Sequence, residues 1–235
     1  MIEIPSKNSE LEHFTELSNE WWSENGKFKL LHRIRHIRMK YIIDQYKPKK
    51  IKNSKILDIG CGGGLITESL AMKGGIVTGI DFVKNNIKIA KKHAFINNLK
   101  INYIYEDIQK LNHKKKYNLI IIFEVLEHLE NWEMLVKKIK KLLLKDGLLI
   151  ISTINRNFLS KIFAIEIAEN ILKWIPKNTH KYSKLIKPDE LTDCLKNEDF
   201  IINNLCGLTY NPFSKRWKLN KKNTNINYFC SAKKN

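Results

Sequence analysis

A glycine-rich turn between an apolar segment and a helical segment is the feature that most constrains how this chain folds. Residues 58–64 read Asp-Ile-Gly-Cys-Gly-Gly-Gly and place glycines at alternate positions, Gly60, Gly62 and Gly64. Apolar residues precede this turn, and those of residues 65–70 after it follow helical spacing. A strand that enters a helix through such glycines presents bare backbone to a ligand, because glycine adopts unusual dihedral angles and has no side chain.

A carboxylate, Asp81, ends the next apolar segment, residues 76–80. Nucleotide-binding α/β units place a carboxylate here to hold ribose hydroxyls. The dinucleotide fingerprint is G-x-G-x-x-G, whereas this loop reads G-x-G-x-G, with Asp58 two residues before its first glycine. This form resembles the loop of methyltransferases that use S-adenosylmethionine (SAM). The resemblance implies that the loop and Asp81 bind SAM, and the alternative is a tight turn without a ligand.

Strand-like and helical segments alternate through the middle of the chain. We expect strands at 55–59, 76–80, 101–105, 117–123 and 148–154, and helices at 65–73, 84–97 and 133–145. Helical segments also occupy 10–22, 30–46 and 158–175, a helix starts near Pro188, and the strand-like segments of the tail are 200–202 and 227–232. The alternation predicts a Rossmann-like, doubly wound α/β fold with a mostly parallel sheet, N-terminal helices and an inserted helical cover.

The chain has no internal repeat and no long linker, so one domain spanning residues 1–235 is expected. Its predicted parts are an N-terminal helical segment (1–50), a SAM-binding core (51–155), a helical cover (156–192) and C-terminal strands that complete the sheet (193–235).

Charge and cysteine content indicate which partners and which cellular compartment to expect for the protein. The formal net charge of +18 would attract nucleic acid or an anionic membrane. The alternative explanation is biased codon use, because the lysines are spread along the whole chain. The four cysteines form no C-x-x-C pair, which favours free thiols in a reducing compartment. Neither a signal peptide nor a run of 18 uncharged apolar residues is visible, so a cytoplasmic protein is expected.

Candidate catalytic residues follow the apolar segment 117–123 at the predicted carboxyl edge of the sheet. If a helical turn begins at Glu124, then Glu127 and His128 stand at i+3 and i+4 and point the same way. Two carboxylates and an imidazole on one face would suit Mg²⁺, and His128 would alternatively serve as a general base. The plainer alternative is a set of ordinary polar residues at the start of a helix.

Two further residues belong to the same predicted edge. Asp107 would accept a hydrogen bond from the adenine amine or cap a helix, and Phe123 would lie beside the adenosine or pack in the core. The motifs of base-directed methyltransferases, Asn-Pro-Pro-Tyr and Pro-Cys, are absent from the predicted site. An oxygen nucleophile is the simplest remaining option.

Several blocks along the chain resemble the ubiquinone-biosynthesis O-methyltransferases. Besides the glycine loop and Glu124-x-Leu126-Glu127-His128, these blocks are Trp21-Trp22, Gly26-Lys27-Phe28, Ser152-Thr153-Ile154-Asn155-Arg156, Thr179-His180, Tyr210-Asn211-Pro212 and Asn227-Tyr228. The resemblance departs at Arg35-His36, where the family usually has Asn-Pro, and at Phe123, where it often has Met.

The resemblance implies an enzyme that methylates the phenolic hydroxyls of 2-polyprenyl-6-hydroxyphenol and 3-demethylubiquinol. It implies that Arg38, Gly60, Asp81 and Phe123 contact SAM, and that Glu124, Glu127 and His128 hold Mg²⁺.

The polyprenyl tail of such substrates lies in a bilayer, which suggests a peripheral protein on the inner face of the bacterial inner membrane. The amphipathic segment 158–175 would then contact anionic lipid, or else only cap the site. A ubiquinone-biosynthesis complex is a further possible partner, and nucleic acid is not expected. The rival functions are an RNA methyltransferase, which the positive charge favours, and a non-catalytic SAM- or lipid-binding subunit of a biosynthetic complex.

Overall fold

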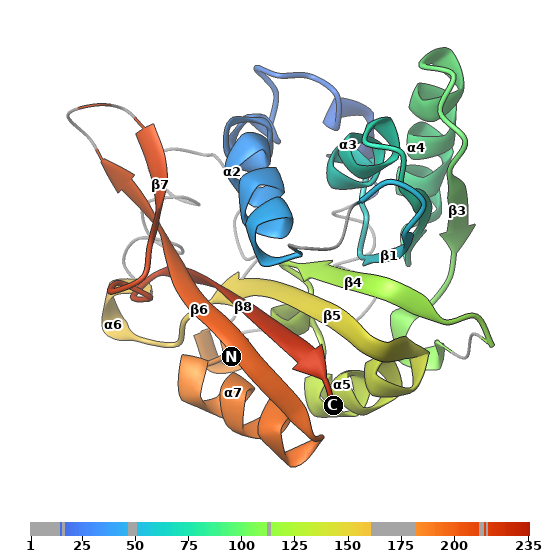
Figure 1. Cartoon of the computed structure of the whole chain (residues 1–235). Coiled ribbons are helices and arrows are strands. Elements are labelled where there is room, and N and C mark those ends of the chain that lie inside the picture. Colours follow the sequence, from blue (N-terminus) through green and yellow to red (C-terminus); the bar gives the residue numbers. More distant parts are fainter. Residues whose placement is uncertain are drawn as a thin grey trace, which may run out of the picture.

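The protein is built on one eight-stranded sheet (Figure 1). The computed structural model describes residue 15 and residues 17–46, 51–111, 114–160, 182–211, 214 and 216–235. The strand order is β3-β2-β1-β4-β5-β8-β6-β7. The strands are β1 (Lys55–Ile59), β2 (Ile76–Asp81), β3 (Asn102–Tyr105), β4 (Tyr117–Phe123), β5 (Leu143–Ile154), β6 (Phe200–Asn211), β7 (Arg216–Asn220) and β8 (Asn227–Lys234).

Strands β3, β2, β1, β4 and β5 are parallel, and β8, β6 and β7 add antiparallel pairs beyond β5. The mostly parallel, doubly wound sheet predicted from the sequence is therefore confirmed. Its carboxyl edge brings together the ends of β1, β2, β4 and β5. Because β8 is antiparallel to β5, the first residue of β8, Asn227, pairs with the last residue of β5, Ile154.

Helices cover both faces of the sheet (Figure 1). The helices α2 (Lys29–Gln45), α3 (Leu65–Met72) and α4 (Lys84–Ile96) lie on one face, and α5 (Trp132–Leu142) and α7 (Pro188–Asn197) on the other. The central strand β4 packs against helices on both faces of the sheet. Leu119 and Ile121 belong to the core beneath α2 and α3, whereas Ile120 and Ile122 belong to the core beneath α5 and α7. A strand buried on both faces explains the nearly continuous apolar run in this segment.

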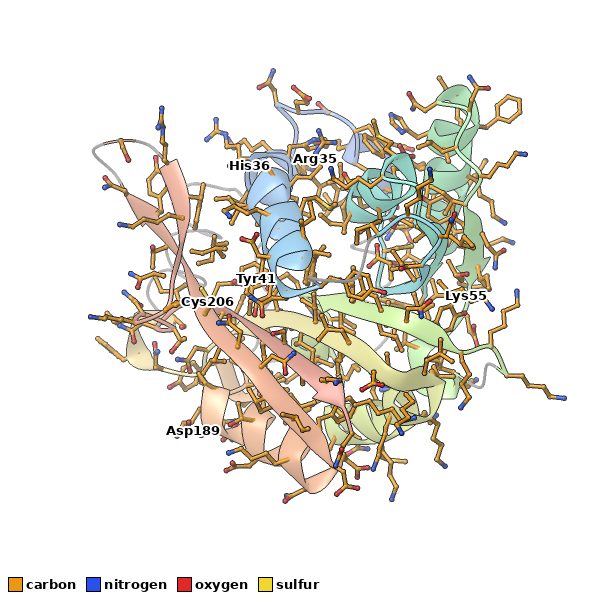
Figure 2. All side chains as sticks on the ribbon, in the orientation of Figure 1. Arg35, His36, Tyr41, Lys55, Asp189 and Cys206 are labelled. Atoms are coloured by element: carbon orange, nitrogen blue, oxygen red, sulfur yellow. The ribbon has the colours of Figure 1, made fainter. Side chains whose placement is uncertain are left out.

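Helix α2 anchors to the antiparallel half of the sheet through Tyr41 (Figure 2). The Tyr41 ring packs on Phe229 of β8 with centroids 4.7 Å apart, and its hydroxyl donates a hydrogen bond to Asn204 Oδ1 of β6 at 3.1 Å. At positions 35 and 36, where the resembling family usually has Asn-Pro, Arg35 and His36 continue the helix without a break. This continuity carries Arg38 into the protein interior.

The largest differences from the sequence prediction lie at the end of α5, the start of β5 and the outer hairpin of β6 and β7. Helix α5 ends at Leu142 and β5 begins at Leu143, although the apolar spacing predicted a helix to residue 145; Leu143 pairs instead with Tyr117. Strand β6 extends to Asn211, well beyond the predicted 200–202, and β7 was not predicted. Asn, Lys and Thr hide the alternation in this outer hairpin, which backbone hydrogen bonds and the contact between the Tyr210 and Trp217 rings hold together.

Two predicted helices fall largely on parts that the structure does not describe. Of the segment 10–22 it describes residue 15 and residues 17–22, with a 3₁₀ turn η1 at Ser18–Glu20. Of the segment 158–175 it describes α6 (Phe158–Ser160), and the rest lies outside the described residues. Across the described part of the chain, no helix has the length and apolar character needed to cross a membrane. The four-part division of the domain stays a prediction.

Candidate active site

The glycine loop connects β1 to α3 and is locked to Asp81 at the end of β2. Gly60, Gly62 and Gly64 have φ angles of +73°, +53° and +94°, a region that side chains disfavour. The Gly62 amide donates to Asp81 Oδ2 at 2.9 Å. The other carboxylate oxygen accepts from the Val83 amide at 2.8 Å and from Asn86 Nδ2 at 3.2 Å. The structure thus brings the predicted loop and the predicted carboxylate into direct contact.

Asp58 lies buried beneath this loop. Its Oδ2 accepts a hydrogen bond of 2.6 Å from the Thr67 hydroxyl at the start of α3. Burial raises the pKa of Asp58 to about 6, although the hydrogen bond from Thr67 opposes the shift. Asp58 therefore ties β1 to α3 behind the loop, which explains its place in the sequence motif.

The N-terminal segment lies directly on the glycine loop. A Cβ atom added to Gly62 or Gly63 would lie 2.4 Å from ring atoms of Trp21, so only glycines fit beneath this indole. Trp21 Nε1 donates to Asn86 Oδ1 at 2.8 Å, and Trp22 Nε1 donates to the Gly63 carbonyl at 3.0 Å. Sequence reasoning missed these contacts and Asn86, although the Trp-Trp block was among the most distinctive.

Trp22 is fixed on its other side by α4. Its ring stacks on His93 with centroids 3.4 Å apart, and His93 Nδ1 lies 2.9 Å from the Glu68 carboxylate of α3. Burial raises the pKa of Glu68, and the neighbouring imidazole opposes this shift. The tryptophan pair therefore joins the glycine loop, α3 and α4.

A second polar cluster centres on Glu124, at the end of β4. Its backbone has a left-handed φ of +53°, an uncommon conformation for a residue with a side chain. Three side chains donate hydrogen bonds to its Oε1 atom: Arg38 at 3.1 Å, Ser152 at 2.5 Å and Asn227 at 3.0 Å. Burial by itself would raise the pKa of Glu124, but the Arg38 charge and these hydrogen bonds hold it below its ordinary value.

The pKa of the neighbouring carboxyl group, Glu127, is shifted in the opposite direction from that of Glu124. Glu127 is 3% exposed, and its Oε2 accepts a hydrogen bond of 2.8 Å from Thr153. Burial and the adjacent Glu124 charge raise the pKa of Glu127 well above its ordinary value. The pair is thus tuned toward one carboxylate and one carboxylic acid. Ser152 and Thr153, which hold one member each, were not predicted as site residues.

The predicted metal group does not form. The 3₁₀ turn η3 spans Leu126–His128 and begins after Glu124, so the expectation that a helical turn starts at Glu124 is wrong. The half-buried His128 belongs to this turn, and its amide donates to the Val125 carbonyl at 3.0 Å. Among the residues that the structure describes, no three His, Cys, Asp or Glu side chains gather where a metal ion could be held.

The remaining predicted residues lie at the same edge. Arg38 is 6% exposed, and the central carbon of its guanidinium lies 5.2 Å from the centre of the Phe123 ring. Phe123 also packs edge-to-face on Phe229, at 5.8 Å between centroids. Asp107 caps the 3₁₀ turn η2 (Ile108–Lys110) by accepting from the Gln109 amide at 3.0 Å, which is the capping alternative of the sequence prediction.

Comparison with known proteins identifies the family. A methyltransferase-domain model matches residues 30–203. The ubiquinone biosynthesis O-methyltransferase of Rickettsia bellii is 43% identical over 229 residues, covering 97% of this chain and 95% of the relative. The chain belongs to the ubiquinone biosynthesis O-methyltransferases. A member from Pelagibacter ubique is 42% identical over 234 residues, covering 96% of this chain and 97% of that relative.

Solved structures agree on the fold of this methyltransferase. Magnesium protoporphyrin IX methyltransferase from Synechocystis, crystallised with bound S-adenosylhomocysteine (SAH), superposes with a TM-score of 0.71, covering 98% of this chain and 100% of that chain. At 16% identity this likeness shows a shared fold and no more. The predicted family and the predicted class I methyltransferase fold are both confirmed.

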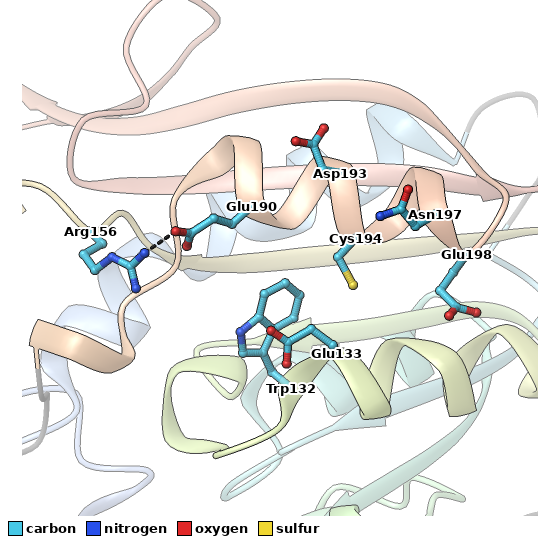
Figure 3. A pocket seen from close by; sticks show the side chains of 8 residues that line it. All are labelled: Trp132, Glu133, Arg156, Glu190, Asp193, Cys194, Asn197 and Glu198. Carbon is cyan, nitrogen blue, oxygen red and sulfur yellow. Dashed lines mark hydrogen bonds and ion pairs between the residues drawn. The ribbon is translucent and has the colours of Figure 1, made fainter.

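A pocket of about 570 Å³ lies between α5 and α7 of this methyltransferase, on the sheet face opposite α2 and α3 (Figure 3). An ion pair between Arg156 and Glu190 closes one end of it (Figure 3). Its lining residues are Trp132, Glu133, Arg156, Glu190, Asp193, Cys194, Asn197 and Glu198. None of them is a predicted site residue, so this pocket is distinct from the glycine loop and the Glu124 cluster.

Proposed function

We propose that this methyltransferase transfers the methyl group of SAM to a phenolic oxygen of a polyprenylated ubiquinone precursor. The substrates would be 2-polyprenyl-6-hydroxyphenol and 3-demethylubiquinol. The observation that carries the proposal is the buried Arg38–Glu124 cluster at the end of β4, the strand next to the glycine-loop strand β1, in a chain of this family. This cluster would bind the phenolic hydroxyl, and the neighbouring glycine loop would bind SAM.

The cofactor would lie against the glycine loop. The positive φ angles of Gly60, Gly62 and Gly64 set the shape of this turn, and the segment that carries Trp21 packs against it. A carboxylate accepts about four hydrogen bonds, and Asp81 receives three from the protein, which leaves capacity for a ribose hydroxyl. The other proposed cofactor contacts are Arg38, Phe123 and Asp107.

The chemistry is an in-line displacement. The methyl carbon–sulfur bond breaks with its electron pair staying on sulfur, and the phenol oxygen forms the new bond while its proton moves to a base. Phenols titrate near 10, so a carboxylate held below 4.5 is a poor base for them. Glu124 would therefore orient the hydroxyl, while His128 would accept the proton.

A magnesium ion does not fit the arrangement of these side chains. One Glu124 oxygen, Oε1, already accepts three hydrogen bonds, and one of them comes from Arg38, whose positive charge disfavours a cation beside it. The raised pKa of Glu127 favours its acid form, whereas metal ligands must be deprotonated. No catalytic step is therefore assigned to Mg²⁺.

The substrate tail suggests where the protein works. A polyprenyl chain remains in the bilayer, so we propose a cytoplasmic protein that binds an anionic membrane surface peripherally and joins other enzymes of the pathway there. The net charge of +18 supports such binding. Sedimentation with phosphatidylglycerol vesicles tests it, since binding should weaken as salt rises. Equal binding to neutral vesicles would count against the electrostatic proposal.

The decisive experiment offers the purified chain SAM together with a short-chain demethylubiquinol. Mass spectrometry should detect one added methyl group on the quinol, and a parallel reaction with RNA should give none. Methylation of RNA alone would replace this proposal with the rival enzyme. Binding of SAM with no transfer to either substrate would favour the non-catalytic subunit.

A further inference from the structure

Three unpartnered polar atoms mark the Glu124 cluster. Among the described residues, four buried side-chain polar atoms have no hydrogen-bond partner, and the Tyr103 hydroxyl is the one outside this cluster. The other three are Arg38 Nε, Glu127 Oε1 and Asn227 Oδ1. Buried polar groups are almost always paired, so their concentration at one place points to a bound group that pairs them.

Two of these atoms belong to residues that bind the Glu124 carboxylate through another atom. Arg38 Nη2 and Asn227 Nδ2 bind the same oxygen, Glu124 Oε1, at 3.1 and 3.0 Å. Arg38 and Asn227 thus each bind Glu124 through one nitrogen, while Arg38 Nε and Asn227 Oδ1 remain without a hydrogen-bond partner. Glu127 adds an unpaired oxygen, because Thr153 binds only its Oε2.

The chemistry of the three atoms selects the group that could pair them. Asn227 Oδ1 only accepts and Arg38 Nε only donates, while Glu127 Oε1 does either according to its protonation. A carboxylate would leave the Asn227 oxygen unpaired, and an ammonium would leave the Arg38 nitrogen unpaired. A hydroxyl both donates and accepts, and two neighbouring hydroxyls on one ring would satisfy all three atoms.

We propose that Asn227 is a specificity-determining residue whose side-chain oxygen accepts a hydrogen bond from the substrate hydroxyl adjacent to the one that is methylated. This inference rests on the proposed function and deepens it by assigning the residue that recognises the second hydroxyl of the substrate ring. The position of Asn227 supports it, because the pairing of β8 with β5 brings this residue to the carboxyl edge that carries Glu124.

The test compares two ligands on two proteins. Calorimetry in the presence of SAH measures the affinity for a short-chain ortho-dihydroxybenzene and for the monophenol that lacks the second hydroxyl. The natural chain should prefer the dihydroxy ligand about tenfold, as one hydrogen bond to a buried acceptor allows. Asn227→Leu should reduce that preference to about twofold or less. Asn227→Ser, whose shorter side chain withdraws the acceptor, gives the same test if the leucine variant does not fold.

A matched control removes an asparagine elsewhere in the same sheet. Asn204→Leu loses the bond from Tyr41 but removes none of the three hydrogen bonds to Glu124 Oε1, so this variant should keep the tenfold preference. An unchanged preference in the Asn227 variants would overturn the inference and leave water as the partner. Loss of affinity for SAH itself would also overturn it, because Asn227 would then serve the amino-acid end of the cofactor.

These outcomes separate the inference from the proposed function. If the natural chain methylates the dihydroxy compound while the Asn227 variants keep its preference over the monophenol, only the inference fails. If the natural chain neither binds nor methylates that compound, the proposed function fails with it.

Discussion

Asn86 Oδ1 accepts a hydrogen bond of 2.8 Å from the indole nitrogen of Trp21, which connects the N-terminal segment to helix α4. The same oxygen accepts from the Ser18 hydroxyl at 2.8 Å. Through its nitrogen, Asn86 donates to Asp81 Oδ1 at 3.2 Å. One buried side chain therefore joins the segment that covers the glycine loop to the carboxylate proposed to hold ribose.

Removing this connection should weaken cofactor binding. We expect Asn86→Ala to lower the affinity for SAH about fivefold, since one net hydrogen bond contributes about 1 kcal/mol. Calorimetry measures the affinity, and acrylamide quenching should show Trp21 becoming more accessible. Asn97→Ala, just beyond the same helix and bonded only to His93, is the control. Unchanged affinity in Asn86→Ala would show that Asp81 and Trp21 act independently.

Gly64 should not tolerate a side chain. Its φ is +94°, and a Cβ atom added there would lie 2.3 Å from the Tyr103 hydroxyl oxygen. Gly64→Ala should lower the free energy of unfolding by about 2 kcal/mol or more, through overpacking and backbone strain. Adding Tyr103→Phe should restore part of this loss, because it removes the nearest atom. Urea denaturation of both single variants and the double variant measures the coupling, and strict additivity would argue against the clash.

Asp58 should make stability depend on pH. Its folded pKa is raised from 3.8 to about 6, so between these values the folded state binds more protons and stability falls as pH rises. The shift corresponds to about 3 kcal/mol, fully lost above pH 6. In Asp58→Asn this loss should disappear, so its stability relative to the natural chain should increase between pH 4 and pH 7. Urea denaturation across this range tests it, and parallel pH profiles would refute it.

Arg38 and Glu124 should depend on each other. Both side chains are largely buried, so removing one partner leaves the other charge uncompensated. Arg38→Met and Glu124→Gln should each lower the free energy of unfolding by about 3–5 kcal/mol. The double variant should be more stable than the sum of the two losses implies. A double-mutant cycle by urea denaturation measures this coupling, and a coupling near zero would mean that the pair contributes nothing to stability.

The parallel half of the sheet was predictable because its strands are short apolar runs that end at glycines or carboxylates. The bounds of β1 and β4 match the predicted segments 55–59 and 117–123. The outer hairpin of β6 and β7 was less predictable, because its polar side chains hide the alternation that marks a strand.

The site was predictable only in part. The glycine loop and Asp81 form a local strand–turn–helix unit, so sequence spacing was sufficient to find them. The geometry of Glu124 depends on a left-handed backbone and on donors from α2, β5 and β8, which no local pattern encodes. For the same reason, Asn86 and Asn227 acquire their importance only through contacts with residues distant in the chain.

Strand β8 lies between β5 and β6, although it follows β6 and β7 in the chain. A growing polypeptide on the ribosome therefore has the glycine loop, Asp81 and Glu124 long before it has the strand that brings Asn227 beside them. Until that strand emerges, β6 has no neighbour through which to join the sheet. Formation of the site therefore awaits synthesis of β8, and nascent chains that stop before this strand expose the edge of β5 to chaperones or to aggregation.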